Sequence, residues 1–398
     1  MSYLKSQFPI FQKHPNLVYL DSAATTQKPQ AVIDSIIDFY TSQNSSDHSN
    51  HKLSSKLTQN IDETRQLVAN FLNCQKSEII FTSGATDSLN LIANGLINWQ
   101  IKLNSTVLIC ISEHHSNILP FQRLAEKMQC RVEYFHILES GEINFIDFEE
   151  KVKGAWLVCV SHISNVLGLV NNIEKICQLA HQNRAIVVVD GTQAVSHVEV
   201  DLSKLNCDFY CFSGHKIYGP TGIGILYVKR QYLQNLDCYR LGGGMVDLVT
   251  KDEKYYKEVP YRFESGTSNF AGIIGLGAAV DWFIRNKTQI FAIEDELCEY
   301  TWLQLQKING IKIFGHYDHY KKEIKKIPLF TCSIENINSF DLSMVLANDD
   351  IAIRSGQHCA GILHEFLGIN DTWRISLVCY NTREDIDKFM TFLLKFIG

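Results

Sequence analysis

The sequence predicts an α/β fold in which helices cover both faces of a mostly parallel central sheet. Between about residues 75 and 230, short runs rich in β-branched and apolar residues alternate with segments of helical periodicity. These runs are apolar on both faces, which is typical of parallel strands buried between two helical layers. Polar residues gather directly after the strands, where open α/β sheets bind their ligands.

Seven runs have the length and composition of strands. They are EIIF (78–81), TVLICI (106–111), RVEYFHI (131–137), AWLVCV (155–160), AIVVV (185–189), DFYCF (208–212) and GILYV (224–228). Helical patterns separate most of them. From about residue 284 the rhythm changes, because a long helical pattern leads into shorter strands and helices. We therefore expect a large domain at 20–283 and a smaller α+β domain at 284–398, joined by the N-terminal segment 1–19.

The composition narrows the class of protein. Of the 398 residues, 45% are apolar and 20% are charged, so the chain can bury a core and is not predominantly disordered. A net charge of −6 without a long basic run argues against a nucleic-acid partner. No apolar run approaches the roughly 18 residues of a membrane span, and the first residues lack the apolar stretch of a signal peptide. We expect a cytoplasmic protein that has no membrane partner.

The twelve cysteines are not expected to form a disulfide framework or a structural metal site. Most lie inside apolar runs, where a free cysteine behaves as a small buried hydrophobe, and no Cys-x-x-Cys pair exists. Cys359 differs, because it lies in the polar, glycine-flanked stretch RSGQHCAG.

Five polar clusters follow predicted strands and are expected to assemble one site from distant parts of the sequence. They are Thr82–Asp87, Glu113–Asn117, Ser161–Asn165, Asp190–Gln193 and Ser213–Lys216. The carboxyl ends of parallel strands meet at one edge of a sheet, so these residues should lie together.

Lys216 and Asp190 carry the sharpest chemical signal. A lysine at the mouth of a sheet can form a Schiff base with an aldehyde cofactor if its surroundings lower its pKa, although most lysines are solvated surface residues. Asp190 ends a fully apolar strand, where an unpaired carboxylate is costly. The protonated ring nitrogen of pyridoxal phosphate would be a suitable partner, and a cap on the following helix is the alternative.

Two further clusters fit the same cofactor. Gly84 allows a close backbone approach, and Ala85 and Thr86 would offer N–H groups to a phosphate at a helix N-terminus, although a simple capped turn has the same pattern. His114 can stack on an aromatic ring and shuttle protons, and Asn165 can donate to a phenolic oxygen. Adjacent histidines are also metal ligands in other proteins, but no HExxH spacing follows and we expect no metal.

Together these residues resemble fold-type I pyridoxal-phosphate enzymes of the class V aminotransferase group. The chain is most similar to the Suf-type (group II) cysteine desulfurases, also called selenocysteine lyases. The stretches that carry the resemblance are VYLDSAATTQKP, TSGATDS, EHHSNILP, SHISNVLG, VVVDGTQAV, DFYCFSGHKIYGPTGIGILYV, RFESGT, GIIGLGAA, IAIRSGQHCA and RISLVCYNT. They span nearly the whole chain in the order typical of the family, and SGHK and Asp-Gly-x-Gln are the most specific.

The resemblance implies a role for each matching position toward the cofactor ring. Lys216 would hold pyridoxal phosphate as a Schiff base, and Asp190 would pair with its pyridine nitrogen. His114 would stack on the ring, while Asn165 and Gln193 would address the ring oxygen.

The resemblance also implies a phosphate site and a dimer. Ala85, Thr86, Ser213 and His215 would hold the phosphate. Thr267, in RFESGT, would reach the phosphate of the partner subunit, which implies a homodimer.

The substrate residues implied by the resemblance are Arg374, Arg354 and Cys359. Arg374 would bind the carboxylate of L-cysteine as a fork, with Arg354 near it. Cys359 would accept the sulfur as a persulfide, leaving L-alanine, for iron–sulfur cluster assembly or other sulfur transfer through a Suf-type acceptor protein. L-Selenocysteine is the second expected substrate.

Cys359 and Arg374 are 15 residues apart (374 minus 359) without a long insertion, which resembles group II. His358 and Arg354 would favour the thiolate.

Three departures from the family pattern bear on substrate choice and sulfur delivery. HSNH at 48–51 stands where group II members usually read HRGIH, Gln357 stands where the family has a histidine, and Ser268 stands where it has a proline. Two other readings stay open. One is another class V aminotransferase or lyase in which Cys359 is incidental, and the other is a catalytically silent scaffold of a sulfur-transfer complex.

Overall fold

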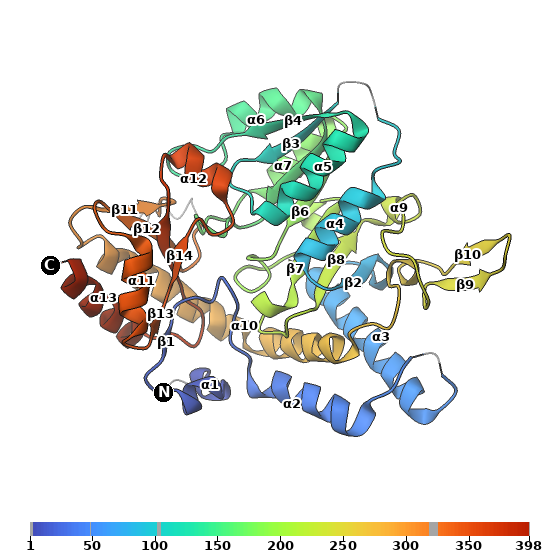
Figure 1. The fold of residues 1–398 in the computed structure, drawn as a ribbon, viewed down its shortest axis with the longest axis horizontal. Helices are drawn as coiled ribbons and strands as arrows, with labels where there is room; N and C mark the ends of the chain where they lie inside the picture. The colour runs from blue at the N-terminus through green and yellow to red at the C-terminus, as the bar shows by residue number, and fades with distance from the viewer. Residues whose placement is uncertain (1–2, 48, 102–104, 318–324, 398) are drawn as a thin grey trace.

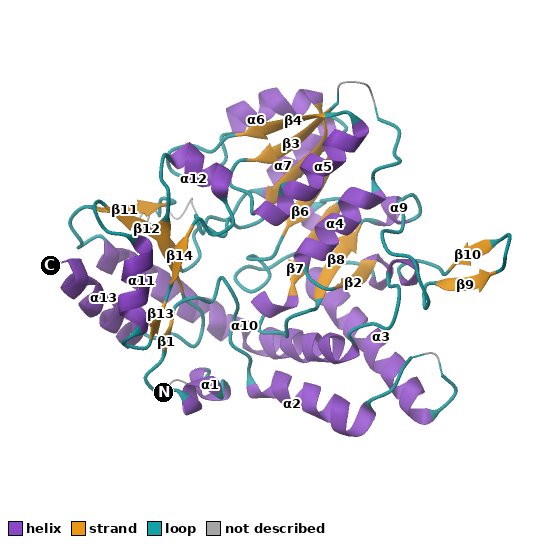
Figure 2. Ribbon diagram, viewed as in Figure 1, coloured by secondary structure: helices purple, strands orange, loops and turns teal. Residues whose placement is uncertain are grey.

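The computed structural model describes residues 3–47, 49–101, 105–317 and 325–397. Figure 1 shows a large sheet with helices around it and a smaller group of strands and helices on the side where both termini lie. In Figure 2 the strands of the large sheet lie inside and the helices outside, as the sequence predicts. None of the helices among the described residues is both long and apolar enough to cross a bilayer.

The large sheet has seven strands in the order β2-β8-β7-β6-β5-β3-β4. Their bounds are β2 Ile79–Thr82, β3 Thr106–Cys110, β4 Arg131–Phe135, β5 Ala155–Ser161, β6 Ile186–Asp190, β7 Phe209–Ser213 and β8 Gly224–Val228. Five neighbouring strands, from β7 to β4, run parallel, and β8 is antiparallel to both of its neighbours. The predicted mostly parallel sheet is confirmed, and each predicted strand is present to within two residues.

Both faces of this sheet are buried, and alternate residues of a strand enter different cores. In β3, Val107 and Ile109 pack into a core on one face, whereas Leu108 and Cys110 pack into the core on the other. The first face is covered by α4 (Ala85–Gly95), α5 (Leu119–Met128) and α9 (Arg230–Leu233).

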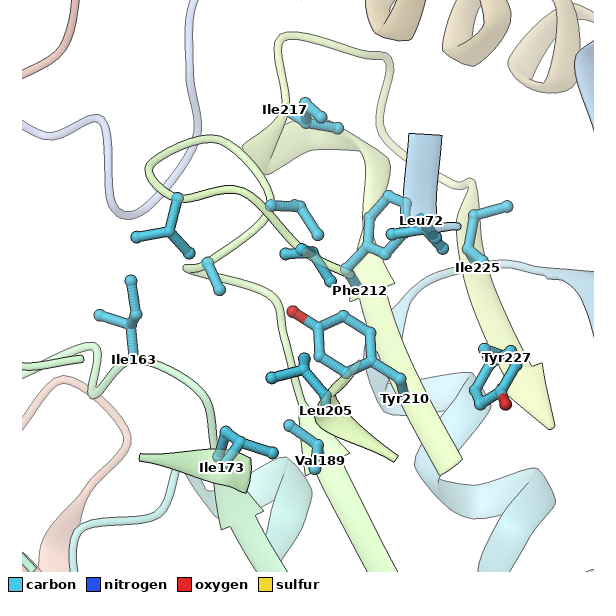
Figure 3. Close-up of a cluster of buried hydrophobic side chains, with 14 of the residues drawn as sticks. Leu72, Ile163, Ile173, Val189, Leu205, Tyr210, Phe212, Ile217, Ile225 and Tyr227 are labelled. Atoms are coloured by element: carbon cyan, nitrogen blue, oxygen red, sulfur yellow. The ribbon is translucent and has the colours of Figure 1, made fainter. Parts of the chain in front are cut away.

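The second face carries the larger core, part of which is drawn in Figure 3 around Tyr210 and Phe212. The helices that contribute to it are α3 (Lys52–Leu72), α6 (Phe145–Lys151), α7 (Ile173–Gln182), α8 (Leu202–Leu205) and α10 (Phe270–Leu305). Helix α2 (Gln30–Asp38) packs on α10, and α1 (Ile10–Lys13) adds Phe11 to the core.

The smaller unit contains an antiparallel sheet in the order β11-β12-β15-β14. Its strands are β11 Ile311–Phe314, β12 Leu329–Ile334, β14 Arg354–Gly356 and β15 Thr372–Ser376, and its helices are α11 Ser339–Ala347, α12 Gly361–Leu367 and α13 Arg383–Ile397. The N-terminal β1 (Val18–Tyr19) pairs with β13 (Ile351–Ala352) of this unit. Helix α10 is continuous across residues 283 and 284, so the expected division into two domains falls inside a helix and stays a prediction.

A hairpin projects from the large unit. Strands β9 (Val246–Val249) and β10 (Lys254–Tyr256) pair antiparallel and extend away from the body at the right of Figure 1. Leu248, Val249 and Tyr255 on this hairpin are exposed.

Candidate active site

A cavity of about 310 Å³ lies at the carboxyl-end edge of the large sheet, where residues of all five polar clusters meet. It also receives residues from the N-terminal segment and from the smaller unit. The predicted site residues that line it are Ala85, Thr86, His114, Asn165, Asp190, Gln193, Ser213, His215, Lys216, Arg354, Cys359 and Arg374. Thr267 lines a separate cavity of about 190 Å³ together with Ser268.

Lys216 follows β7 in a short 3-10 turn and is the amine of this cavity. Its Nζ donates to the carbonyl oxygen of Ala23, to which Gln193 Nε2 also donates at 2.9 Å. Burial, aided by the positive charge of Arg374, lowers the pKa of Lys216 to about 7. A large fraction of the side chain is therefore the neutral amine near pH 7, the form that attacks a carbonyl carbon.

Asp190, the last residue of β6, is a buried carboxylate. Its Oδ1 accepts a hydrogen bond from Thr192 N at 2.9 Å, and no basic side chain among the described residues forms an ion pair with it. The segment after β6 is a series of turns, and the next helix, α8, is capped by Asp201. Asp190 therefore caps a turn, and no helix follows it directly.

His114 follows β3 and faces the same cavity. Its Nδ1 accepts from Ser116 N at 3.1 Å, so the neutral ring carries its hydrogen on Nε2. Burial lowers the pKa of His114. The neighbouring Glu113 is fully buried, accepts from Ser161 N at 2.7 Å, and has its pKa raised to about 8 by burial. Both groups are thus held near their uncharged forms.

The N-terminus of α4 forms part of the cavity wall through Ala85 and Thr86. Gly84 has φ of 152°, and a Cβ placed on it would lie 3.3 Å from Ser213 Oγ, which accepts from Ala85 N at 2.9 Å. His215 Nδ1 is buried without a hydrogen-bond partner among the described residues. Burial and the nearby Lys216 lower the pKa of His215 to about 4, so the ring is neutral.

The two predicted arginines lie on neighbouring strands of the smaller unit. Arg374 on β15 is buried; its Nη1 donates to Asn165 O at 2.8 Å, and burial lowers its pKa to about 10, so it stays charged near neutral pH. Arg354 on β14 is partly exposed and forms a two-point pair with Asp21, with Nη2–Oδ2 at 2.8 Å and Nε–Oδ1 at 3.0 Å.

Sequence reasoning assigned no role to Asp21, which pairs with Arg354 and makes a longer contact of 3.5 Å with Arg374. The signal for it was a carboxylate at the end of the apolar run VYLD, within a stretch already matched to the family. Its partners lie more than 330 residues away in the sequence, and no local pattern predicts that pairing.

Cys359 is exposed at the rim of the cavity, whereas each other cysteine is buried or partly buried. It lies in the turn between β14 and α12. The neighbouring His358 is buried, and its Nε2 lies 2.9 Å from Thr372 Oγ1. Burial lowers the pKa of His358 to about 2, so this ring is neutral and does not favour a thiolate by charge, contrary to the sequence-based expectation. Arg354 remains as a cation lining the same cavity.

Comparison with known proteins agrees with this geometry. A family model for aminotransferase class V matches residues 18–389. The chain is 38% identical over 392 residues to a probable cysteine desulfurase of Halalkalibacterium halodurans, covering 96% of this chain and 95% of that protein. The structure superposes on a cysteine desulfurase from Thermococcus onnurineus with a TM-score of 0.93, 33% identity and coverage of 98% and 96% of the two chains. It superposes on a cysteine desulfurase from Escherichia coli with a TM-score of 0.89 and 31% identity, covering 98% of this chain and 97% of that one.

The chain belongs to the class V aminotransferase family. Its similarity is to the cysteine desulfurases of that family, and the Suf-type subgroup suggested by the sequence is compatible with it. The cofactor of this class V protein is pyridoxal phosphate, and the residues present fit it. Asp190 offers an unpaired buried carboxylate to a pyridinium nitrogen, and the α4 N-terminus with the orphaned His215 Nδ1 offers donors to a phosphate.

The described residues of the three departures from the family pattern do not line the site cavity. His48 lies outside the described residues, and His51 caps α3 by accepting from Ser54 N at 3.2 Å. Gln357 donates to Asn370 O at 3.0 Å and does not line the site cavity. Ser268 lies beside Thr267 in the second cavity.

Proposed function

We propose that this class V enzyme converts L-cysteine to L-alanine and transfers the sulfur to Cys359 as a persulfide. The observation that carries the proposal is the convergence of three groups on one cavity. A buried amine, a buried guanidinium and an exposed thiol line it together, and they are Lys216, Arg374 and Cys359.

The guanidinium and the amine orient the substrate. Arg374 is fixed by the hydrogen bond from its Nη1 to Asn165 O. Its Nη2 makes a long contact of 3.5 Å with Asp21, and it can exchange that weak contact for a substrate carboxylate. Lys216 would hold the cofactor, and its amine, when free, would serve as a base toward the substrate. Pyridoxal phosphate supplies an electron sink that stabilises negative charge at the substrate Cα.

Proton and sulfur transfers then fall to residues of this chain. The neutral amine of Lys216 takes the Cα proton. The Cys359 thiolate attacks the substrate Sγ, an S–S bond forms, and the Cβ–Sγ bond breaks with its electron pair going to carbon. Protonation of that carbon gives alanine, so L-cysteine and a thiol become L-alanine and a persulfide, with sulfur oxidised and carbon reduced.

Product analysis separates this proposal from its rivals. L-Cysteine should give alanine, and sulfide when a reductant is present, with the mass of the Cys359 peptide raised by one sulfur atom. A keto acid instead of alanine would indicate a transaminase in which Cys359 is incidental. A purified protein without cofactor or product would indicate a scaffold.

A homodimer is part of the proposal, with Thr267 serving the phosphate in the partner's site. Thr267 does not line the cavity that contains Lys216 of its own chain. The projecting hairpin β9–β10 exposes Leu248, Val249 and Tyr255, apolar side chains that a second copy would cover.

The wider setting follows from the same resemblance. We propose that the protein is a group II enzyme of the cytoplasm and that a small Suf-type acceptor protein removes the persulfide for iron–sulfur cluster assembly. L-Selenocysteine would enter the same site and release selenium. The short interval between Cys359 and Arg374 supports this placement. Incubation with L-cysteine and then with a candidate acceptor, followed by mass measurement of both proteins, tests it.

A further inference from the structure

The turn that carries Cys359 has an unfavourable backbone. His358 and Cys359 have φ of 54° and 57°, so two consecutive non-glycine residues adopt the left-handed region. This region is unfavourable for residues that carry a Cβ, because the Cβ comes close to the following carbonyl oxygen. The turn therefore depends on contacts from outside to keep this conformation.

His115 supplies two of these contacts, one to the carbonyl of Cys359 and one to the amide of Gly361. Its main-chain N–H donates to Cys359 O at 2.8 Å. Its ring Nε2 accepts from Gly361 N at 3.0 Å, at the first residue of α12. An acceptor at Nε2 places the hydrogen of the neutral ring on Nδ1.

The other contacts of the turn show why His115 matters. Gln357 and His358 contact Asn370 and Thr372, which belong to the same unit as the turn. His115 and Asn165, which donates to His358 O at 2.8 Å, connect the turn to the large sheet. His115 is also next to His114, which lines the cavity, whereas His115 itself does not.

We propose that His115 is a positioning residue that holds the Cys359 turn against the short 3-10 turn His115–Asn117 that follows β3, so that the thiol stays within reach of the substrate sulfur. This inference rests on the proposed role of Cys359. His115 touches neither the cavity nor the reacting atoms, and it acts through the main chain of the turn.

The test compares His115→Leu with His115→Gln. The Leu variant lacks the acceptor for Gly361 N–H, whereas the Gln side chain can present Oε1 near the position of Nε2. For His115→Leu we expect kcat for sulfide release to fall roughly tenfold or more, because a misplaced reacting group is costly. KM for L-cysteine and the change in the visible spectrum on adding L-cysteine should remain as in the wild type. His115→Gln should recover most of kcat, and His14→Leu, an exposed histidine, should behave as the wild type.

A second measurement follows the turn without catalysis. Amide hydrogen exchange of Gly361 should be at least roughly tenfold faster in His115→Leu, since its acceptor is gone, and near the wild-type rate in His115→Gln. Gly361→Pro removes the donor while keeping the ring, and proline is tolerated at a first helical position. It should reproduce the loss of kcat, whereas Gly361→Ala should not. If His115→Leu fails to fold, the comparison of Gly361→Pro with Gly361→Ala decides whether the His115 contact positions the turn.

Several outcomes would overturn the inference. They are wild-type kcat in the folded Leu variant, no recovery in the Gln variant, or a lost spectral response to L-cysteine, which would place the ring at the cofactor. Cys359→Ser is assayed beside them. Full sulfide release by that variant would refute the role of Cys359 itself, and the exchange rates of Gly361 would still report whether His115 holds the turn.

Discussion

Arg354 and Arg374 lie directly opposite each other on the antiparallel strands β14 and β15, and both contact the carboxylate of Asp21. The contacts are unequal. Arg354 makes the short two-point pair, and Arg374 makes a single contact of 3.5 Å. Asp21 therefore occupies Arg354 and leaves the buried Arg374 available to the substrate.

The first prediction follows from that inequality. Arg374→Ala should raise KM for L-cysteine and cost about 2–4 kcal/mol in kcat/KM, because a desolvated charge pair is lost. Arg374→Lys should recover part of the lost kcat/KM, since lysine keeps the positive charge but not the two-point geometry of the guanidinium. Arg354→Ala should cost less. Steady-state kinetics of the three variants check this. A larger loss of kcat/KM in Arg354→Ala than in Arg374→Ala would assign the substrate carboxylate to Arg354 instead.

The second prediction separates Cα chemistry from sulfur removal. Cys359→Ser should keep the spectral response to L-cysteine and release almost no sulfide, because Lys216 and the cofactor act on Cα whereas Cys359 alone takes the sulfur. Spectral titration and a sulfide assay on one preparation test it. L-Selenocysteine is a weaker probe, since selenium can leave without a nucleophile.

The third prediction concerns Lys216 and pH. Its pKa is about 7 in the fold and 10.5 in the unfolded chain, so the unfolded chain binds more protons between these values and stability rises with pH there. The folded apoprotein thus loses stability as pH falls from about 10 to about 7, by up to roughly 4–5 kcal/mol at 1.36 kcal/mol per unit. Lys216→Met should flatten this slope in urea unfolding of the apoprotein.

Lys13→Met, a change at an exposed lysine, is the control and should leave the slope in place. Lys28 is partly buried and its pKa is also lowered to about 7, so it should preserve part of the slope in the Lys216 variant. In the loaded enzyme, borohydride should fix the cofactor to Lys216. An adduct on another lysine would reassign the Schiff-base residue.

The fourth prediction concerns a buried ion pair beside the Thr267 loop. Arg65 Nη1 and Nη2 lie 2.7 and 2.8 Å from Glu264 Oε1 and Oε2, and Glu264 also accepts from Phe81 N. Arg65→Met leaves the Glu264 charge buried and should cost about 3–5 kcal/mol of stability. Arg285→Met, which breaks an exposed pair with Asp281, should cost about 1 kcal/mol or less. Denaturant unfolding of both variants tests the contrast.

The sequence predicted the sheet well because its strands are local signals. Seven apolar runs and five polar clusters each lie within a few residues, and the geometry of parallel strands brings the clusters together. Asp21 with its arginines and Arg65 with Glu264 escaped prediction because each pair joins segments that are nearly 200 or more residues apart.

Helix α10 was underestimated for another physical reason. Its long helical pattern was recognised only from about residue 284, but the helix begins at Phe270, in a stretch rich in glycine. Glycine usually argues against a helix. Here it permits close packing, since a Cβ on Gly277 would lie 2.7 Å from Thr64 Oγ1 of α3, and one on Gly275 would lie 3.1 Å from Ile36 of α2. Such tertiary contacts override local propensity.

The last prediction tests the dimer through two inactive variants, Lys216→Ala and Thr267→Glu. The glutamate should repel the cofactor phosphate. If Thr267 serves the partner's site, a mixed dimer has one site with both defects and one site with neither. Subunit exchange should then restore activity from two inactive proteins, up to half of the wild-type value per mixed dimer. If Thr267 served its own chain, every site would carry one defect and no activity would return. Circular dichroism and gel filtration must first show that Thr267→Glu is folded and dimeric, and absence of recovery in a verified mixed dimer would then remove Thr267 from the partner's site.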